Sequence, residues 1–375
     1  MGLLTSGLPD FPWDTLVPYA ERARRHPDGL VDLSVGTPVD PTPPLVREAL
    51  AGAADAPGYP TTHGTPALRQ AVVDWFARRR GAPGLDPEAV LPTVGSKELV
   101  AWLPSLLGLG EGDVVVHPES AYPTYDVGAR LAGATPLAAD DVAAWEGRTD
   151  VRLVWLNSPS NPTGAVLGVE DLRRVVAAAR RLGAVVASDE CYALLPWDEP
   201  WASQGVPSVL DPRVCDGDPT GLLAVHSLSK QSNLAGYRAA FAAGDPLLVR
   251  RLLEVRKHAG MIVPAPVQAA MTAALADDAH VEAQRERYRR RRVVLLRGLE
   301  AAGLEVDGSP AGLYLWARAA GAGQHCWDTV GDLADLGILV APGAFYGPAA
   351  ARHVRVALTA SDDDVARAAA RLEGA

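Results

Sequence analysis

The chain has 375 residues, enough for two domains or for one large and one small domain. With 48% hydrophobic and 21% charged residues it is globular, and its net charge of −10 argues against nucleic acid as the main partner. Its first residues lack the regions of a signal peptide, and its apolar stretches are too short or too interrupted to span a bilayer. We therefore expect a cytoplasmic protein that binds neither nucleic acid nor membranes.

The three cysteines, Cys191, Cys215 and Cys326, are odd in number, lie far apart and lack the spacing of metal ligands. Reduced thiols and no metal site are therefore expected.

The first 45 residues are rich in proline and glycine and contain one strand-like piece, Leu30–Val35. Such a segment cannot close a core alone, so we expect it to pack against a distant part of the chain. A short helix is predicted at 45–54, followed by a turn-rich loop at 58–66 and an amphipathic helix that begins near Leu68.

From Val90 onward, apolar strands alternate with helical patterns, which indicates a mostly parallel sheet covered on both faces. Ligands of such sheets gather at the carboxyl ends of the strands, and there the chain places its polar clusters. The predicted strands of this part are 90–94, 114–117, 153–156, 184–187 and 222–225.

The last part alternates differently, which predicts a small α+β domain. We expect helices up to about 302, then strands at 312–316, 338–341 and 354–358 with helices at 326–336 and 361–374. The predicted division is an N-terminal segment, 1–45, that completes the small domain, a large domain, 46–281, and the small domain, 282–375.

Lys230 is one of only three lysines among 35 basic residues, and it stands at a strand end in Ser227-Leu-Ser-Lys230, with Arg238 eight residues later. A lone lysine is more often a surface charge. If its surroundings lower its pKa, however, its amine can form a Schiff base with an aldehyde. The neighbouring motifs have to decide between these interpretations.

Four further motifs fit parts of one aldehyde cofactor. Gly95-Ser96-Lys97 at a helix start suits a phosphate, although Gly-Ser is often only a cap. Tyr122, between prolines, fits a flat ring or equally a core. Asn161, in Asn161-Pro-Thr-Gly, fits a phenolate or carboxylate oxygen. Asp189 ends a buried strand and needs a cationic partner such as a pyridinium, whose opposite edge Tyr192 would reach.

This inventory matches pyridoxal 5′-phosphate (PLP). Arg238 would add a charge to the phosphate. Arg355, in His353-Val-Arg-Val, would bind a substrate carboxylate through its forked donors, although a lone strand arginine is more often a surface residue.

The motifs resemble the class I/II aminotransferases of PLP fold type I from about Leu30 to the C-terminus. The resemblance implies an aspartate-aminotransferase-like α/β fold in which Lys230 bonds the cofactor and then moves the substrate's proton. It also implies that Asp189 keeps the pyridine protonated. The other implied contacts are Tyr122 on the ring, Asn161 and Tyr192 at the phenolate oxygen, Gly95, Ser96, Lys97, Ser227 and Arg238 at the phosphate, and Gly36, Asn161 and Arg355 at the substrate α-carboxylate.

Tyr59 resembles the tyrosine that reaches the phosphate from a neighbouring subunit, which implies a homodimer with shared active sites. Leu8-Pro-Asp-Phe-Pro-Trp-Asp, 31–40, 257–266 and Phe345-Tyr-Gly-Pro resemble the actinobacterial N-succinyl-LL-diaminopimelate aminotransferases of lysine biosynthesis. The implied substrates are glutamate or 2-oxoglutarate and N-succinyl-2-amino-6-oxopimelate. His63 stands where that family has a small residue, and another amino acid of the same class is the alternative substrate.

A Ser-Lys hydrolase and a non-catalytic PLP-binding regulator are two competing functions that fit the sequence less well. Ser227-x-x-Lys230 fits the Ser-Lys hydrolases, but in those enzymes the serine begins a helix, whereas Ser227 is expected to follow a strand. They also need Lys-Thr-Gly and Ser-Asp-Asn, and neither triplet occurs here. A non-catalytic PLP-binding regulator usually carries an added DNA-binding domain, for which this chain leaves no room. A PLP-dependent transaminase is the prediction.

Overall fold

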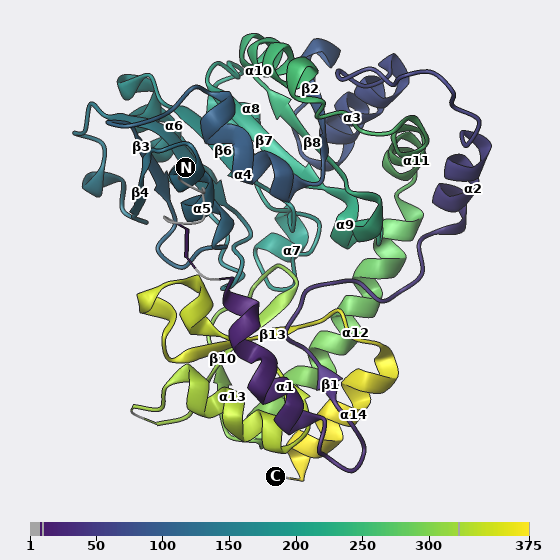
Figure 1. The fold of residues 1–375 in the computed structure, drawn as a ribbon, viewed down its shortest axis with the longest axis vertical. Helices are drawn as coiled ribbons and strands as arrows, with labels where there is room; N and C mark the ends of the chain where they lie inside the picture. Colours follow the sequence, from purple (N-terminus) through teal and green to yellow (C-terminus); the bar gives the residue numbers. More distant parts are fainter. Residues whose placement is uncertain (1–7, 10, 322, 375) are drawn as a thin grey trace, which may run out of the picture.

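The computed structural model describes residues 8–9, 11–321 and 323–374. It has a large domain, at the top of Figure 1, and a small domain, at the bottom. Helix α12 (Ala279–Ala301) runs from the large domain into the small one. Val281, in the first turn of α12, belongs to the core of the large domain, whereas Leu295 and Leu299 belong to that of the small domain. One continuous helix therefore fixes the two cores relative to each other.

The large domain is built on a seven-stranded sheet with the order β2-β8-β7-β6-β5-β3-β4. Only β8 runs against its neighbours in this sheet, so the predicted mostly parallel sheet is confirmed. The edge strand β4 was not predicted, because Thr135-Pro-Leu-Ala is partly exposed and carries a proline rather than an apolar run. The strands are β2 (Val90–Val94), β3 (Val114–His117), β4 (Thr135–Ala138), β5 (Val151–Asn157), β6 (Val185–Asp189), β7 (Leu222–Ser227) and β8 (Ala239–Gly244).

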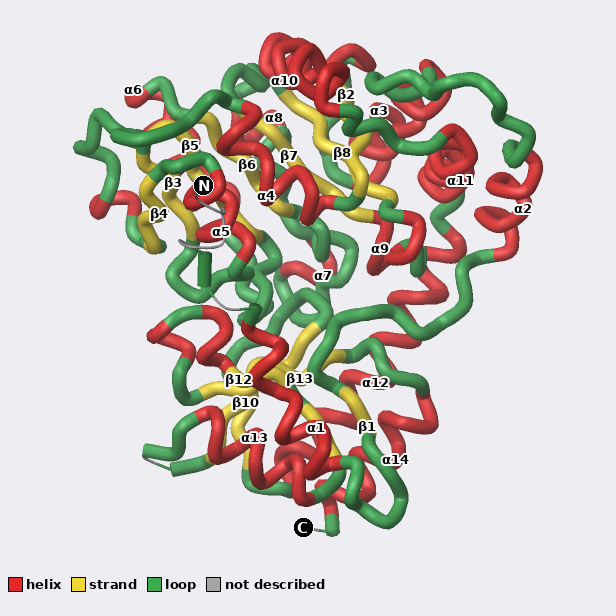
Figure 2. The backbone as a smooth tube through the Cα atoms, viewed as in Figure 1, coloured by secondary structure: helices red, strands yellow, loops and turns green. Residues whose placement is uncertain are grey.

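Helices cover both faces of this sheet (Figure 2). Along β5, Val154 and Leu156 enter one core while Leu153 and Trp155 enter the opposite one, because successive strand residues point to opposite faces. Burial on both sides explains why the strands read as continuous apolar runs. One face carries α3 (Pro66–Arg79), α6 (Val169–Leu182), α8 (Pro212–Cys215) and α11 (Ala265–Ala276); the other carries α4 (Ser96–Leu106), α5 (Thr124–Leu131) and α10 (Pro246–Ala259). The remaining helices of this domain are α2 (Pro44–Gly52), α7 (Trp201–Gln204) and α9 (Leu228–Gln231).

The small domain joins a four-stranded antiparallel sheet, β12-β13-β10-β9, to a parallel pair, β1-β11. The expected strand 338–341 was wrong as one element, because Val340 separates two short strands that pair in different sheets. The elements are β1 (Val31–Asp32), β9 (Leu304–Val306), β10 (Tyr314–Ala319), β11 (Ile338–Leu339), β12 (Ala341–Pro342), β13 (His353–Ala357), α1 (Val17–Ala23), α13 (Cys326–Asp335) and α14 (Asp362–Glu373).

The N-terminal chain contributes little regular structure of its own. Of the expected strand Leu30–Val35, only Val31–Asp32 is a strand, and it lies parallel to β11. The predicted domain limits stay predictions; the second of them, after residue 281, falls inside α12, and the segment 1–45 includes residues 1–7 and 10, which lie outside the described ones. Across the described residues, no helix combines the length and apolar character that crossing a membrane requires.

Candidate active site

A cavity of about 490 Å³ lies where the carboxyl ends of β2, β5, β6 and β7 meet the small domain. Gly95 does not line the cavity, but it lies beside the guanidinium of Arg238, which does. Tyr59 does not line it, and its side chain is fully exposed. The fold thus brings most of the predicted residues into one place. Those that line the cavity are Gly36, Ser96, Lys97, Tyr122, Asn161, Asp189, Tyr192, Ser227, Lys230, Arg238 and Arg355.

Lys230 lies on the short helix α9, directly after β7. Its ammonium donates a hydrogen bond to the backbone carbonyl of Gly36, and its own carbonyl accepts one from Tyr288 Oη at 3.2 Å. Burial lowers the pKa of Lys230, which increases the fraction of the nucleophilic free amine.

Ser227 is the last residue of β7 and also the N-cap of α9, where its hydroxyl accepts from the Ser229 N–H at 3.2 Å. Ser227 therefore ends a strand, as expected, and also begins a helix, which was not expected. Its Oγ donates to Ser229 Oγ at 2.8 Å rather than to the lysine. Two hydroxyls consequently face the cavity beside Lys230.

The anion-binding corner is formed by the start of α4 and by Arg238. Gly95 precedes α4 with φ 77°, and a Cβ there would collide with the Arg238 guanidinium. Arg238 itself has φ 54° and donates to the Ala235 carbonyl at 2.9 Å. A helix N-terminus, hydroxyls and a guanidinium are suitable donors for a phosphate. Lys97, predicted for the same role, has its ammonium 5.7 Å from the ring centre of Phe11 and 5.9 Å from that of Tyr122.

Asp189 ends β6 as a buried acid. Its Oδ2 accepts from Tyr125 Oη at 2.9 Å and its Oδ1 from the Cys191 N–H at 3.2 Å. Burial raises the pKa of Asp189, and these two hydrogen bonds oppose the shift only in part. Among the residues with described positions, no cation pairs with it. The carboxyl is therefore suited to a cationic ligand atom, as predicted.

Arg355, on β13, is 3% exposed and points into the cavity. Its Nη1 donates to Asn161 Oδ1 at 2.9 Å and its Nη2 to the Ser34 carbonyl at 2.7 Å. Its buried Nε has no partner in the described part of the chain. Asn161 is held in turn by its N–H, which donates to Asn157 Oδ1 at 2.7 Å. A guanidinium with a spare buried donor fits a carboxylate.

Two tyrosines meet beside Lys230. Tyr192 follows β6, and its hydroxyl lies 3.2 Å from that of Tyr314, on β10. Neither Tyr314 nor Tyr125 was predicted. The signal for Tyr125 was its position three residues after Tyr122, on the first turn of a helix. Tyr314 carried no signal beyond being an aromatic residue in a predicted strand.

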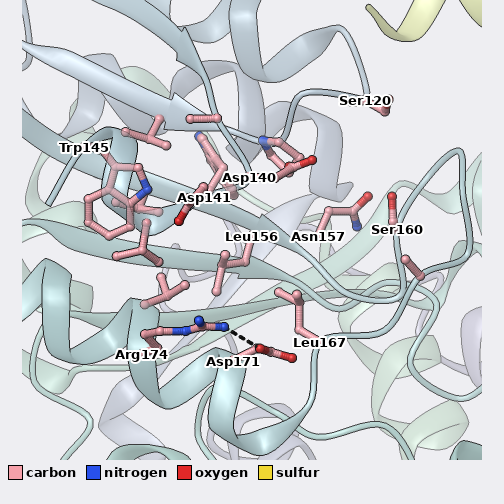
Figure 3. Close-up of a pocket in the computed structure, with 18 of the residues that line it drawn as sticks. Ser120, Asp140, Asp141, Trp145, Leu156, Asn157, Ser160, Leu167, Asp171 and Arg174 are labelled. Atoms are coloured by element: carbon pink, nitrogen blue, oxygen red, sulfur yellow. Dashed lines mark hydrogen bonds and ion pairs between the residues drawn. The ribbon is translucent and has the colours of Figure 1, made fainter. Parts of the chain in front are cut away.

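A second cavity, of about 460 Å³, lies on the α6 side of β5 (Figure 3). It is lined by Asp141 and Trp145 and by the ion pair of Arg174 with Asp171, in which Nη2 and Oδ1 are 2.7 Å apart. It shares Asn157 with the first cavity but contains none of the predicted site residues. The first cavity is therefore the candidate active site.

Residues 28–372 match the family model described as aminotransferase class I and II. The chain belongs to this family. It is 60% identical over 365 residues to 4-dedimethylamino-4-oxo-anhydrotetracycline transaminase OxyQ of Streptomyces rimosus, which covers 97% of this chain and 99% of that protein. It is 62% identical over 372 residues to the probable aminotransferase Rv1178 of Mycobacterium tuberculosis, covering 99% and 87%.

Among solved structures, the fold is similar to a probable N-succinyldiaminopimelate aminotransferase from Thermus thermophilus, with 29% identity, a TM-score of 0.85 and coverage of 97% and 100%. The predicted class, its α/β fold and its use of PLP are thus confirmed, and the protein is a PLP-dependent transferase. The residues of the first cavity fit that cofactor: an amine for its aldehyde, a buried acid for its ring nitrogen and an anion-binding corner. The roles of single residues stay predictions.

Proposed function

We propose that this aminotransferase moves an amino group between glutamate or 2-oxoglutarate and N-succinyl-2-amino-6-oxopimelate, in lysine biosynthesis. The observation that carries the transfer chemistry is that Lys230, Asp189 and Arg355 line one cavity, although they lie in three distant parts of the sequence. When bound, PLP supplies an aldehyde and a ring that accepts electrons.

The residues around the cavity would divide the work. The Lys230 amine, whose pKa burial lowers, would take the proton from the α-carbon of the amino donor, and in the second half-reaction it would deliver a proton to the α-carbon of the acceptor. Asp189 would hold a positive charge on the ring nitrogen, and Tyr122 would pack against the ring. The phosphate would be held by Gly95, Ser96, Lys97, Ser227 and Arg238, and the phenolate oxygen would accept from Asn161 and Tyr192.

The substrate α-carboxylate would bind Arg355, with Asn161 and Gly36 beside it. Arg355 is oriented before substrate arrives, because Asn161 Oδ1 and the Ser34 carbonyl hold its two terminal nitrogens. A preoriented guanidinium loses little conformational entropy when it binds a carboxylate. Both substrates of the proposed reaction carry this group, so one arginine serves both half-reactions.

Support for the succinylated acceptor comes from the segments that resemble that aminotransferase family and from the Thermus structure of that name. A second candidate acceptor is a polycyclic ketone of the kind named for OxyQ, and the 60% identity to that protein favours it. An acceptor ketone without a neighbouring carboxylate would not need Arg355.

The deciding experiment is a set of absorbance spectra of the PLP-loaded protein with single amino donors, followed by turnover with each acceptor. We expect glutamate and N-succinyl-diaminopimelate to bleach the cofactor band, and Arg355→Leu to abolish both effects. If no α-amino acid changes the band, the transaminase proposal is wrong. If only the ketone accepts the amino group, and Arg355→Leu retains that half-reaction, the second candidate replaces the first.

We also propose a homodimer with shared active sites. The Tyr59 side chain is fully exposed on a single chain, so it is free to enter the site of a second copy. Sedimentation of the PLP-bound protein should give twice the chain mass, and Tyr59→Phe should weaken PLP binding about 2- to 10-fold through the loss of one hydrogen bond. A monomer with full PLP affinity would contradict this.

A further inference from the structure

We propose that Tyr314 is a positioning residue with two separable functions: its ring orients Arg355, and its hydroxyl donates to Tyr192. The inference rests on the proposed transaminase function and deepens it. It concerns a residue that neither the motifs nor the family match singles out.

The ring function follows from the packing of Arg355. The guanidinium carbon lies 3.9 Å from the ring centre of Tyr314, and the ring of Tyr346 follows at 5.1 Å. All three side chains are buried. A cation over an aromatic face is most strongly attracted where water is excluded. The Tyr314 ring therefore fixes the plane in which Arg355 offers its donors to a carboxylate.

The hydroxyl function follows from the crowding around Gly36. A Cβ at residue 36 would collide with the Tyr314 hydroxyl and lie only 2.8 Å from two of its ring carbons. The Gly36 carbonyl also accepts from the Lys230 ammonium. Glycine at position 36 thus leaves room for the Tyr314 hydroxyl, which lies 3.2 Å from Tyr192 Oη. Gly36 therefore contacts both this hydroxyl and the Lys230 amine.

The direction of the hydrogen bond between the two tyrosines matters, because a phenol has one proton to donate. With PLP bound, Tyr192 would give its single proton to the phenolate oxygen, so its own oxygen can only accept from the Tyr314 hydroxyl 3.2 Å away. Tyr314 therefore donates to Tyr192, and the Tyr192 proton remains available for the phenolate oxygen of PLP, strengthened by the bond behind it.

The test compares Tyr314→Phe, which removes only the hydroxyl, with Tyr314→Leu, which also removes the aromatic face. For Tyr314→Phe we expect the pH midpoint of the visible band of lysine-bound PLP to rise by about 0.3 to 1 unit, since a weaker donor to the phenolate favours the protonated form. The KM for glutamate should change less than about twofold, because the ring remains. Tyr314→Leu should raise this KM about 5-fold or more as well.

A double-mutant cycle with Tyr192→Phe tests whether Tyr314 acts through its hydrogen bond to Tyr192 or through a general disturbance of the site. If Tyr314 acts through Tyr192, adding Tyr314→Phe to Tyr192→Phe should not shift the pH midpoint of the visible band any further. An equal shift in both backgrounds, or no shift in the wild type, would overturn the hydroxyl function. Equal KM values for the Phe and Leu variants would overturn the ring function. A wild-type protein whose band does not respond to glutamate would instead refute the proposed function, so the two failures are distinguishable.

Discussion

Two neighbouring carboxyl groups at the end of β6 are both buried, but their surroundings differ. Glu190 accepts from Arg80 Nη2 at 2.8 Å, from Ser208 Oγ at 3.0 Å and from the Val209 N–H at 2.8 Å. Within the described part of the chain, Asp189 accepts only from the neutral donors Tyr125 and Cys191. The first acid is neutralised inside the protein, whereas the second is not.

This difference separates structure from function. A buried charge is tolerated when it is paired and hydrogen-bonded, and it is costly when it is not. Glu190 and Arg80, far apart in sequence, therefore tie α3 to the loop that follows β6. A cationic ligand atom can supply the charge compensation that the buried Asp189 carboxylate does not receive from the protein. Asp189 is therefore suited to bind a ligand.

The largest effect is expected on the cavity side. Lys230→Ala should lower kcat at least about 10³-fold, because the amine both bonds the cofactor and moves the proton. The thermal unfolding of the cofactor-free protein should change little. The matched control is Lys257→Ala, an exposed lysine, which should retain full turnover. Normal turnover by Lys230→Ala would refute the assignment.

Breaking the paired acid should act on stability instead. Glu190→Gln leaves the Arg80 guanidinium buried without its counter-charge, and we expect a loss of about 3–5 kcal/mol in the free energy of unfolding by denaturant. The turnover per folded molecule should be nearly normal. Glu254→Gln, in an exposed ion pair with Lys257, is the control and should unfold like the wild type. A similar loss in both variants would contradict the comparison.

Asp189→Asn should show the opposite pattern, with a loss of turnover on the order of 10²-fold as charge stabilisation of the ring is removed. Because burial raises the pKa of Asp189 in the cofactor-free protein, the stability it contributes is present at low pH and is lost as the pH rises through that pKa. Without cofactor, the asparagine variant should therefore unfold at the same temperature as the wild type or at a higher one at pH 7. The difference between the two unfolding temperatures should shrink as the pH is lowered. A variant less stable at pH 7 would count against this account.

The smallest effect is expected for Tyr125→Phe, which removes one hydrogen bond to Asp189. A neutral hydrogen bond contributes about 0.5–1.5 kcal/mol, so equilibrium dialysis should show PLP affinity changed about 2- to 10-fold. Tyr19→Phe, on α1 outside the cavity, is a suitable control. If Tyr125→Phe weakened PLP binding as much as Asp189→Asn does, the hydrogen bond and not the charge of Asp189 would account for that binding.

Much of the candidate site could be predicted because its residues stand in short motifs at the ends of apolar strands. Lys230, Asp189 and Asn161 each follow such a strand, and a parallel sheet must bring those ends to one edge. Tyr125 and Tyr314 could not be assigned, because their functions depend on which atoms they meet. The strand expected at 338–341 failed for a similar reason, since its two halves pair with β1 and β13, which are distant in sequence.

The sequence by itself determined the class of the fold and the cofactor, because its strand pattern and its short motifs resemble those of a known family, whereas Lys230 as the reactive amine stays a prediction. The tertiary structure alone decided which buried acid is paired, where the Lys97 ammonium points and how Tyr314 lies between Gly36, Tyr192 and Arg355. Those properties arise from contacts between residues far apart in the chain, and the energy of a charge or a phenol depends on the neighbours that folding brings to it.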